Sequence, residues 1–167
     1  QGFGNFLRRD LFDRVPFKTV NTIDSTAADP EAECRRYADL LQEYPCDIVC
    51  MGIGENGHIA FNDPHVADFN DKKAVKVVEL DETCRQQQVN DGCFARLSEV
   101  PAHALTLTIP TLVAPKAVFC IVPAKTKANA VKATLRGPVT EACPASILRR
   151  HANAALYCDA DSAALIL

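Results

Sequence analysis

The stretch Asp47–Pro64 reads "DIVCMGIGENGHIAFNDP", and it joins a continuous apolar run to a loop that holds three glycines and one histidine. A short apolar run such as Ile48–Met51 is typical of a strand that is buried on both faces of a parallel sheet. In an open sheet of this kind, ligands bind beyond the carboxyl ends of the strands. The stretch therefore predicts an α/β fold and also the edge of the sheet at which a site would lie.

On either side of this stretch, predicted helices alternate with predicted strands. The clearest helical pattern begins at Asp29, which can cap the first turn, and continues with Pro30 at the first helical position. Strands separated by helices imply parallel pairing with right-handed crossovers, so we expect a layered α/β fold with a mostly parallel, Rossmann-like sheet and helices on both faces. The predicted helices cover residues 3–12, 29–44, 81–91, 126–137 and 144–151, and the predicted strands cover 47–53, 74–80, 103–110, 116–122 and 154–159.

The size and charge of the chain limit the classes of protein to which it can belong. Its 167 residues, 48% of them hydrophobic, are enough for one domain, which we expect to span 1–167. With 18 basic and 21 acidic residues the net charge is -3, which offers no basic surface for nucleic acid or for an anionic membrane. No apolar stretch approaches the roughly 20 residues that cross a bilayer, and the N-terminus lacks the pattern of a signal peptide. We therefore expect a cytoplasmic protein.

Eight cysteines raise the question of a disulfide framework or a zinc site. The sequence contains no C-x-x-C pair, and although Cys46 and Cys50 stand four apart, no second pair lies at the spacing of a zinc finger or ribbon. Several cysteines lie in apolar segments, where the thiol acts as a small hydrophobic group. We expect reduced, mostly buried thiols and no structural metal.

The glycines of the loop suit close contact with a ligand. Gly52, Gly54 and Gly57 can adopt positive φ and let a ligand approach the backbone, with amides that point toward an anionic or hydroxylated group. Their spacing matches the dinucleotide fingerprint G-x-G-x-x-G, but that fingerprint requires a helix to start in the loop. Here the residues that follow, "HIAFNDP", are turn residues, so we do not expect a nicotinamide cofactor.

His58 is the candidate for acid/base chemistry in this loop. Carboxyl or carboxamide side chains lie close to it in sequence on both sides, and a histidine that is oriented by such a group can move a proton near neutral pH. The spacing alone leaves open a second interpretation, a loop histidine whose hydrogen bonds are satisfied by its own turn.

The whole loop resembles the signature of the glucosamine-6-phosphate deaminase (isomerase) family, Gly-x-Gly-x-Asp/Asn-Gly-His-Ile-x-Phe-Asn-Glu-Pro, which forms part of the active site there. Residues 103–137, "HALTLTIPTLVAPKAVFCIVPAKTKANAVKATLRG", and 144–165, "PASILRRHANAALYCDADSAAL", also resemble this family, so the resemblance runs from residue 2 to residue 165. It implies an enzyme that converts glucosamine 6-phosphate into fructose 6-phosphate and ammonia, with a sugar phosphate as its small-molecule partner. It implies no cofactor, because enolisation of an aldose needs only a well-placed base and acid.

The resemblance also implies roles for single residues. His58 falls on the histidine that moves a proton between the ring oxygen and the anomeric hydroxyl, Asn56 on the group that orients it, and Asp63 on the ring-opening Glu. Lys127 falls on the lysine that contacts the phosphate. Gly52, Gly54 and Gly57 would belong to the site that binds the substrate and its phosphate.

Several positions depart from the family pattern. Asp63 is one methylene shorter than Glu, and Asn90 falls near the family's phosphate-binding arginine, for which Arg85 is the available substitute. Lys76 and Val78 fall on a basic pair that binds N-acetylglucosamine 6-phosphate in regulated members, so we do not expect that regulation.

Two further family motifs do not occur between Gln1 and Leu167: the Thr/Ser-Gly-Gly phosphate loop and the Asp-Glu-Tyr segment whose Asp removes the C2 proton. We therefore expect a fragment, the C-terminal two thirds of a longer enzyme, with an apolar edge or face left exposed. A missing N-terminal segment or a homo-oligomer would cover it, and the isolated chain is not expected to deaminate sugar.

Two alternative functions stay open. One is a non-catalytic sugar-phosphate-binding domain or regulatory paralogue, and the other is a hydrolase similar to 6-phosphogluconolactonase. Outside the loop, we interpret His65 as a solvated loop residue, and His103 and His151 as structural. Asp159 and Asp161 resemble a metal-binding pair, but a helix cap is the simpler interpretation.

Overall fold

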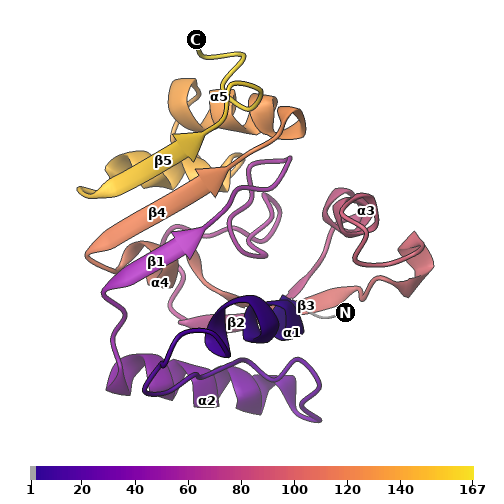
Figure 1. Cartoon of the computed structure of the whole chain (residues 1–167), viewed down its shortest axis with the longest axis vertical. Coiled ribbons are helices and arrows are strands. Elements are labelled where there is room, and N and C mark those ends of the chain that lie inside the picture. Colours follow the sequence, from indigo (N-terminus) through magenta and orange to yellow (C-terminus); the bar gives the residue numbers. More distant parts are fainter. Residues whose placement is uncertain (1–2) are drawn as a thin grey trace.

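The computed structural model describes residues 3–167 and is built around a small parallel sheet (Figure 1). Its three strands lie in the order β1, β4, β5, and both neighbouring pairs are parallel. The parallel sheet with helices packed on it confirms the α/β class. The strands are β1 (Ile48–Met51), β4 (Ala117–Val122) and β5 (Ala154–Cys158).

The other two predicted strands form a separate antiparallel pair, β2 (Val75–Glu79) with β3 (His103–Leu107). This differs from the parallel pairing that helix-separated strands imply. The connection contains α3 (Glu82–Asn90) and the short turn η2 (Leu97–Glu99), and in Figure 1 it lies to one side of the pair instead of crossing a face of the sheet. Because the chain turns back without a crossover, β3 returns along β2 in the opposite direction.

The remaining helices largely follow the sequence pattern. As predicted, Asp29 caps α2 by accepting a hydrogen bond from the backbone N–H of Ala32 (3.0 Å). One helix was not predicted: the expected strand 103–110 ends at Leu107, and a short helix follows with Pro110 in its first turn. The helices and helical turns are α1 (Phe3–Leu7), η1 (Arg8–Phe12), α2 (Pro30–Glu43), α4 (Ile109–Val113), η3 (Lys125–Lys127), α5 (Ala128–Arg136) and η4 (Pro144–Arg150).

The main core lies on one face of the parallel sheet. Val118, Cys120 and Val122 alternate along β4 and are almost completely buried against a cluster that includes Val131 of α5 and Ile147 of η4. Burial of each valine side chain is worth roughly 1.5–3 kcal/mol. This face therefore fixes β4 and β1, and with them the start of the loop that follows β1.

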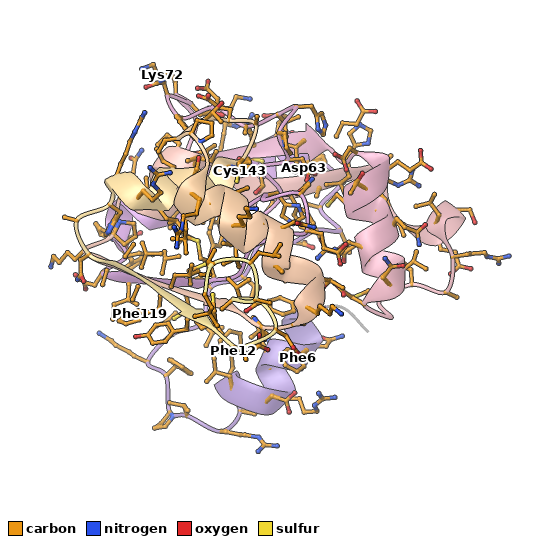
Figure 2. The ribbon with its side chains drawn as sticks, turned by 90° about the horizontal axis from the view of Figure 1, so that it is seen from above. Phe6, Phe12, Asp63, Lys72, Phe119 and Cys143 are labelled. Carbon is orange, nitrogen blue, oxygen red and sulfur yellow. The ribbon has the colours of Figure 1, made fainter. Side chains whose placement is uncertain are left out.

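The opposite face of the same sheet is open. Ile48, Ile121 and Tyr157 are 57%, 49% and 52% exposed, and Phe119 stacks on Tyr157 with ring centroids 6.4 Å apart. Figure 2 shows Phe119 on the side of the sheet away from α5. Within residues 3–167 the main core therefore covers one face of the parallel sheet, and the predicted exposed apolar face is present.

The open face also changes the expectation for the cysteines. All eight are free thiols, but only four are buried: Cys34, Cys84, Cys120 and Cys143. Cys50 is exposed because its partner in the sheet is Phe119, so both side chains point to the open face. Cys158 is exposed at the end of the edge strand β5.

The N-terminal segment is helical as predicted but contributes nothing to the core. Neither α1 nor η1 contains a buried residue, and Phe3, Phe6 and Leu11 are exposed. Within residues 3–167, no helix combines the length and the apolar character that crossing a membrane requires.

Candidate functional site

The loop after β1 folds into a compact turn that places its polar side chains inside the molecule. The N–H of Gly54 donates to the carbonyl of His58 (2.9 Å), and the N–H of Gly57 donates to the carbonyl of Gly54 (3.0 Å). Gly57 has φ +85°, and a Cβ added there would lie 2.8 Å from Sγ of Cys143. Positive φ is thus needed at Gly57, whereas Gly52 and Gly54 are not in that region. No helix begins between His58 and Pro64, in agreement with the predicted turn.

His58, Asn56 and Asp63 come together as a polar cluster in which His58 and Asp63 are buried. Nδ1 of His58 lies 2.9 Å from Oδ1 of Asp63, and Nδ2 of Asn56 donates to the same oxygen at 2.8 Å. Oδ1 of Asn56 accepts a hydrogen bond from the backbone N–H of His58 (3.0 Å). The contact between His58 and Asp63 is close, but it is not aligned as a hydrogen bond. The imidazole therefore lies against the carboxylate without an aligned hydrogen bond, and Asn56 contacts both residues.

Asp63 is completely buried, which sets two effects on its pKa against each other. Burial raises the pKa of this carboxyl, but the contacts with His58 and Asn56 lower it by more, so the pKa lies below its ordinary value. Asp63 is accordingly a carboxylate at neutral pH. Its second oxygen, Oδ2, has no hydrogen-bond partner in the described part of the chain.

Gly54 provides the space in which the His58 ring lies. A Cβ added at Gly54 would be 2.2 Å from Cε1 of His58 and 2.3 Å from Nδ1. The sequence predicts that a ligand approaches the backbone here, but in the structure the imidazole itself fills that position. Gly52 differs, because a Cβ there would meet only the carbonyl oxygen of Ile121, at 3.4 Å.

Helix α3 brings two residues to the loop that sequence reasoning missed. Cys84 is buried, and its Sγ lies within 4.8 Å of ligand atoms of His58 and Asp63; burial raises the pKa of this thiol to about 12. Oε1 of Gln87 accepts a hydrogen bond from the backbone N–H of Glu55 (3.2 Å). The two residues are three apart and so share one face of α3. That spacing is the one signal in the sequence, and it does not indicate what the face contacts.

The residues expected to bind phosphate are less well placed. Lys127 follows β4. Because β4 is the parallel neighbour of β1, the chain after β4 leaves the sheet at the same edge as the loop after β1. The side chain of Lys127 makes no ion pair with any residue from 3 to 167. Asn90 is exposed at the end of α3. Arg85 does not replace the missing arginine, because its Nη2 donates to the carbonyls of Leu97 and Val100, both at 2.9 Å.

Three of the other polar residues singled out in the sequence, Lys76, His65 and His151, have structural partners. Lys76 pairs with Asp71 (2.8 Å) and is largely buried, so it does not offer a free charge to an effector. One ring nitrogen of His65 contacts the carbonyl oxygen of Glu79 (3.0 Å), and the His65 side chain is half-exposed. The ring of His151 lies between the carbonyl of Pro115 and the N–H of Asn153, at 2.8 and 3.0 Å, and His103 is exposed at the start of β3.

Asp159 acts as a turn cap and not as half of a metal pair. Its two oxygens accept from the backbone N–H groups of Ser162 (2.7 Å) and Ala124 (2.9 Å). It thereby ties the chain after β5 to the turn after β4. Among residues 3–167, the combination of side chains suited to a metal is a different one, His58, Asp63 and Cys84.

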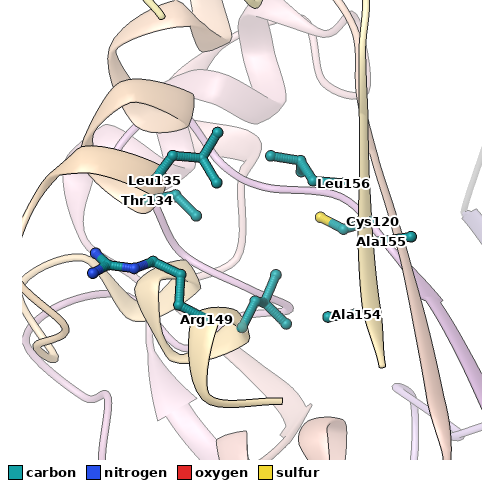
Figure 3. A pocket seen from close by; sticks show the side chains of 8 residues that line it. Cys120, Thr134, Leu135, Arg149, Ala154, Ala155 and Leu156 are labelled. Atoms are coloured by element: carbon teal, nitrogen blue, oxygen red, sulfur yellow. The ribbon is translucent and has the colours of Figure 1, made fainter. Parts of the chain in front are cut away.

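A small pocket of about 130 Å³ lies away from this loop, between α5, η4 and the edge strand β5 (Figure 3). Its walls are mostly apolar, with Leu135, Leu148 and Leu156 among them. The one charged side chain, Arg149, is engaged with the carbonyl of Gly137. We therefore assign the chemistry to the loop and not to this pocket.

Comparison with known proteins finds one matching family and several curated proteins that are similar to the chain. The family described as glucosamine-6-phosphate isomerases/6-phosphogluconolactonase matches residues 4–157. Glucosamine-6-phosphate deaminases of Bacillus thuringiensis (strain Al Hakam) and Bacillus cereus (strain AH820) are each 39% identical over 160 residues, which is 96% of this chain. The chain spans 59% of the length of these relatives.

Solved structures show the same relationship. A monomeric glucosamine-6-phosphate deaminase superposes with a TM-score of 0.77 at 39% identity, over 84% of this chain and 56% of that one. The 6-phosphogluconolactonase of Trypanosoma brucei gives 0.75 at 20% identity, over 98% and 67% of the two chains. The second comparison shows a common fold.

Proposed function

The chain belongs to the family of glucosamine-6-phosphate isomerases and 6-phosphogluconolactonases, and on that premise we propose that the loop 52–64 opens the ring of an amino-sugar 6-phosphate. One observation carries the proposal: the imidazole of His58 rests on Gly54 against the buried carboxylate of Asp63, which Asn56 also contacts. Glucosamine 6-phosphate is the substrate that fits this family membership, and no cofactor is needed.

Ring opening requires two proton movements at one centre. The anomeric hydroxyl O1 must lose a proton, the bond between C1 and the ring oxygen O5 must break, and O5 must gain a proton. A neutral His58 can accept the first proton and donate the second, so it ends the step unchanged. The Asp63 carboxylate, 2.9 Å from Nδ1, stabilises the imidazolium that exists between the two transfers.

Phosphate recognition would rest mainly on Lys127. Lys127 lies in the segment that follows β4, at the same edge of the sheet as the loop after β1. Its ammonium group has no anionic partner among residues 3–167. With Asn90 in place of an arginine and Arg85 bound to backbone carbonyls, neither position supplies a bidentate clamp for the phosphate. We therefore expect weak phosphate binding that falls with salt.

Conversion of glucosamine 6-phosphate into fructose 6-phosphate and ammonia also needs a base that removes the C2 proton. The motif that carries this Asp in the family has no counterpart in residues 1–167. We propose that ring opening is the contribution of this chain, and that deamination belongs to the complete family fold. The eight free thiols suit a reducing compartment, which supports a cytoplasmic location.

Ring opening can be tested directly, because it interconverts the α and β anomers of glucosamine 6-phosphate. We expect the 167-residue chain to accelerate this exchange, measured by NMR exchange spectroscopy, without release of ammonia. His58→Gln should reduce the catalysed exchange about 10²- to 10⁴-fold, the usual contribution of a general acid/base. His65→Gln, a change of the same kind in a half-exposed position, is the control and should leave the rate unchanged.

Each other outcome has a defined meaning. Full exchange in His58→Gln would contradict the role of His58. Release of ammonia by the chain alone would show that residues 1–167 contain an enolisation base. Binding of the sugar phosphate in calorimetry without faster exchange would favour a non-catalytic binding domain, for which the replacement of the arginine by Asn90 is the supporting observation.

The other enzymatic candidate is hydrolysis of 6-phosphogluconolactone, since the matched family includes 6-phosphogluconolactonases. The continuation "IAFNDP" after His58 resembles the deaminase signature, which favours the amino sugar. A substrate panel that contains both compounds separates the two. Lactone hydrolysis that is lost in His58→Gln, without any effect on anomer exchange, would reverse the assignment.

A further inference from the structure

We propose that Nδ1 of His58, the carboxylate of Asp63 and Sγ of Cys84 form a binding site for a single zinc ion. These three ligand atoms lie within 4.8 Å of one another, and all three residues are buried. Two of them come from the loop after β1 and one from α3, so the site exists only in the folded chain. The proposal concerns an ion that binds reversibly, in addition to the ring-opening role of the loop.

Unpartnered polar atoms point to a ligand at this position. Nδ1 of His58 and Oδ2 of Asp63 are both buried. Nδ1 has only the unaligned contact with Oδ1 of Asp63 (2.9 Å), and Oδ2 has no aligned hydrogen bond to any described residue. Buried polar atoms are nearly always fully hydrogen-bonded, so these two atoms mark a place where a further group would be stabilised. An imidazole nitrogen, a carboxylate oxygen and a thiolate are also the three ligand types that zinc binds in proteins.

The geometry needs only a small adjustment. Zinc bonds of about 2.0–2.3 Å imply that tetrahedral ligands stand roughly 3.3–3.8 Å apart. The contact between His58 and Asp63 is now 2.9 Å, so these two would separate slightly, and Cys84 would move inward. The backbone of Cys84 is held by Asp81, whose Oδ1 accepts its N–H at 2.6 Å, so a side-chain rotation is the movement required. Three protein ligands leave the fourth position for water.

Charge balance also favours the ion. Without metal, the buried carboxylate of Asp63 lies beside the thiol of Cys84 and the imidazole of His58. When zinc binds, the S–H bond of Cys84 breaks, the S–Zn bond forms and one proton leaves to solvent. The charges of Zn²⁺, one carboxylate and one thiolate then sum to zero, which is the arrangement that burial tolerates best.

Cys120 shows that burial of a thiol is not enough. It is as fully buried as Cys84, and burial raises its pKa to about 12 as well. It belongs to the apolar core with Val118, Val122 and Val131, and it lies outside the group His58, Asp63 and Cys84. Cys120 is therefore the matched control for Cys84.

Zinc at this site would stop ring opening, because it occupies the nitrogen of His58 that faces Asp63. That consequence rests on the proposed function, whereas binding of the ion does not. The affinity can therefore be measured without any substrate. Zinc would then act as a reversible inhibitor of ring opening.

Cobalt(II) is a suitable probe because it takes the place of zinc and gives a thiolate-to-metal absorption band. The four exposed cysteines, Cys46, Cys50, Cys93 and Cys158, are first changed to serine to remove adventitious thiolates. We expect one cobalt ion per chain, a thiolate band, and displacement by zinc. Cys84→Ala should abolish the band and weaken binding at least tenfold, whereas Cys120→Ala should change neither.

His58→Gln provides a second variant in case Cys84→Ala does not fold, which circular dichroism would reveal. It should keep the cobalt thiolate band but weaken binding at least tenfold. A band that persists in Cys84→Ala, or no binding in the parent chain, would overturn the proposal. Cobalt binding with no catalysed anomer exchange in the metal-free chain would contradict the ring-opening function alone.

Discussion

An acidic side chain lies beside a basic one at each end of strand β1. The two pairs have similar separations but differ in burial. At the amino end, Nζ of Lys116 lies 2.7 Å from Asp47, with side chains 85% and 72% exposed. At the carboxyl end, Nδ1 of His58 lies 2.9 Å from Asp63, which is completely buried. Water screens the first pair, while the second interacts in a medium of much lower effective dielectric constant. A short separation therefore does not identify a functional pair, whereas burial with further polar partners does.

The buried pair also belongs to a network, and the exposed pair does not. Asp63 is contacted by Asn56, and Asn56 in turn accepts a hydrogen bond from the backbone of His58. Removal of one member leaves the others buried without partners, which costs more than the lost contact. Removal of Asp47 or Lys116 merely exposes its partner to water. Three substitutions test this difference between the buried and the exposed pair.

The largest effect should come from Gly54→Ala. Its Cβ would lie 2.2 Å from the His58 ring, so the imidazole has to leave its position against Asp63. We expect the catalysed exchange of glucosamine 6-phosphate anomers to fall to the buffer rate. Gly52→Ala is the matched control, because its Cβ meets only one atom at 3.4 Å and should leave most of the activity. Equal rates in the two variants would show that the position of the imidazole does not matter.

A smaller effect is expected for stability when the carboxylate at the buried end is neutralised. Asp63→Asn keeps the shape of the side chain but replaces an acceptor that Asn56 and His58 share. The loss should lower the free energy of unfolding by about 1–3 kcal/mol, the usual cost of an unsatisfied buried polar group. Urea denaturation of Asp63→Asn and Asp47→Asn measures the difference. If both variants lost the same stability, the contrast between the two ends of β1 would be wrong.

The sequence allowed the carboxyl end of β1 to be predicted because its information is local. An apolar run, three glycines and a flanked histidine all lie within Asp47–Pro64, and turn chemistry acts over a few residues. The cap Asp29 was predictable for the same reason. Local patterns therefore gave the loop, the helix starts and the α/β class.

Features that depend on contacts between distant segments could not be predicted in this way. Nothing in "DETCRQQQVND" indicates that Cys84 lies against Asp63 or that Gln87 contacts the backbone of Glu55. The antiparallel pairing of β2 with β3 depends on where α3 packs, and the exposure of Cys50 depends on what covers a sheet face. Apolar periodicity reports which residues favour burial, but not whether a partner is present to bury them.

The smallest effect should appear at the amino end of β1, in Lys116→Met. The hydrogen bond from Lys116 holds the pKa of Asp47 below its ordinary value, so the folded chain binds this proton less readily than the unfolded chain. The pair therefore adds stability at neutral pH, and that contribution is lost as the pH falls through the ordinary carboxyl pKa toward the lowered one. Because both groups are exposed, we expect the thermal unfolding midpoints of parent and variant to differ little at pH 7, and to converge on acidification or in high salt. A large difference at pH 7 that survives high salt would mean that Asp47 and Lys116 do more than form a surface pair.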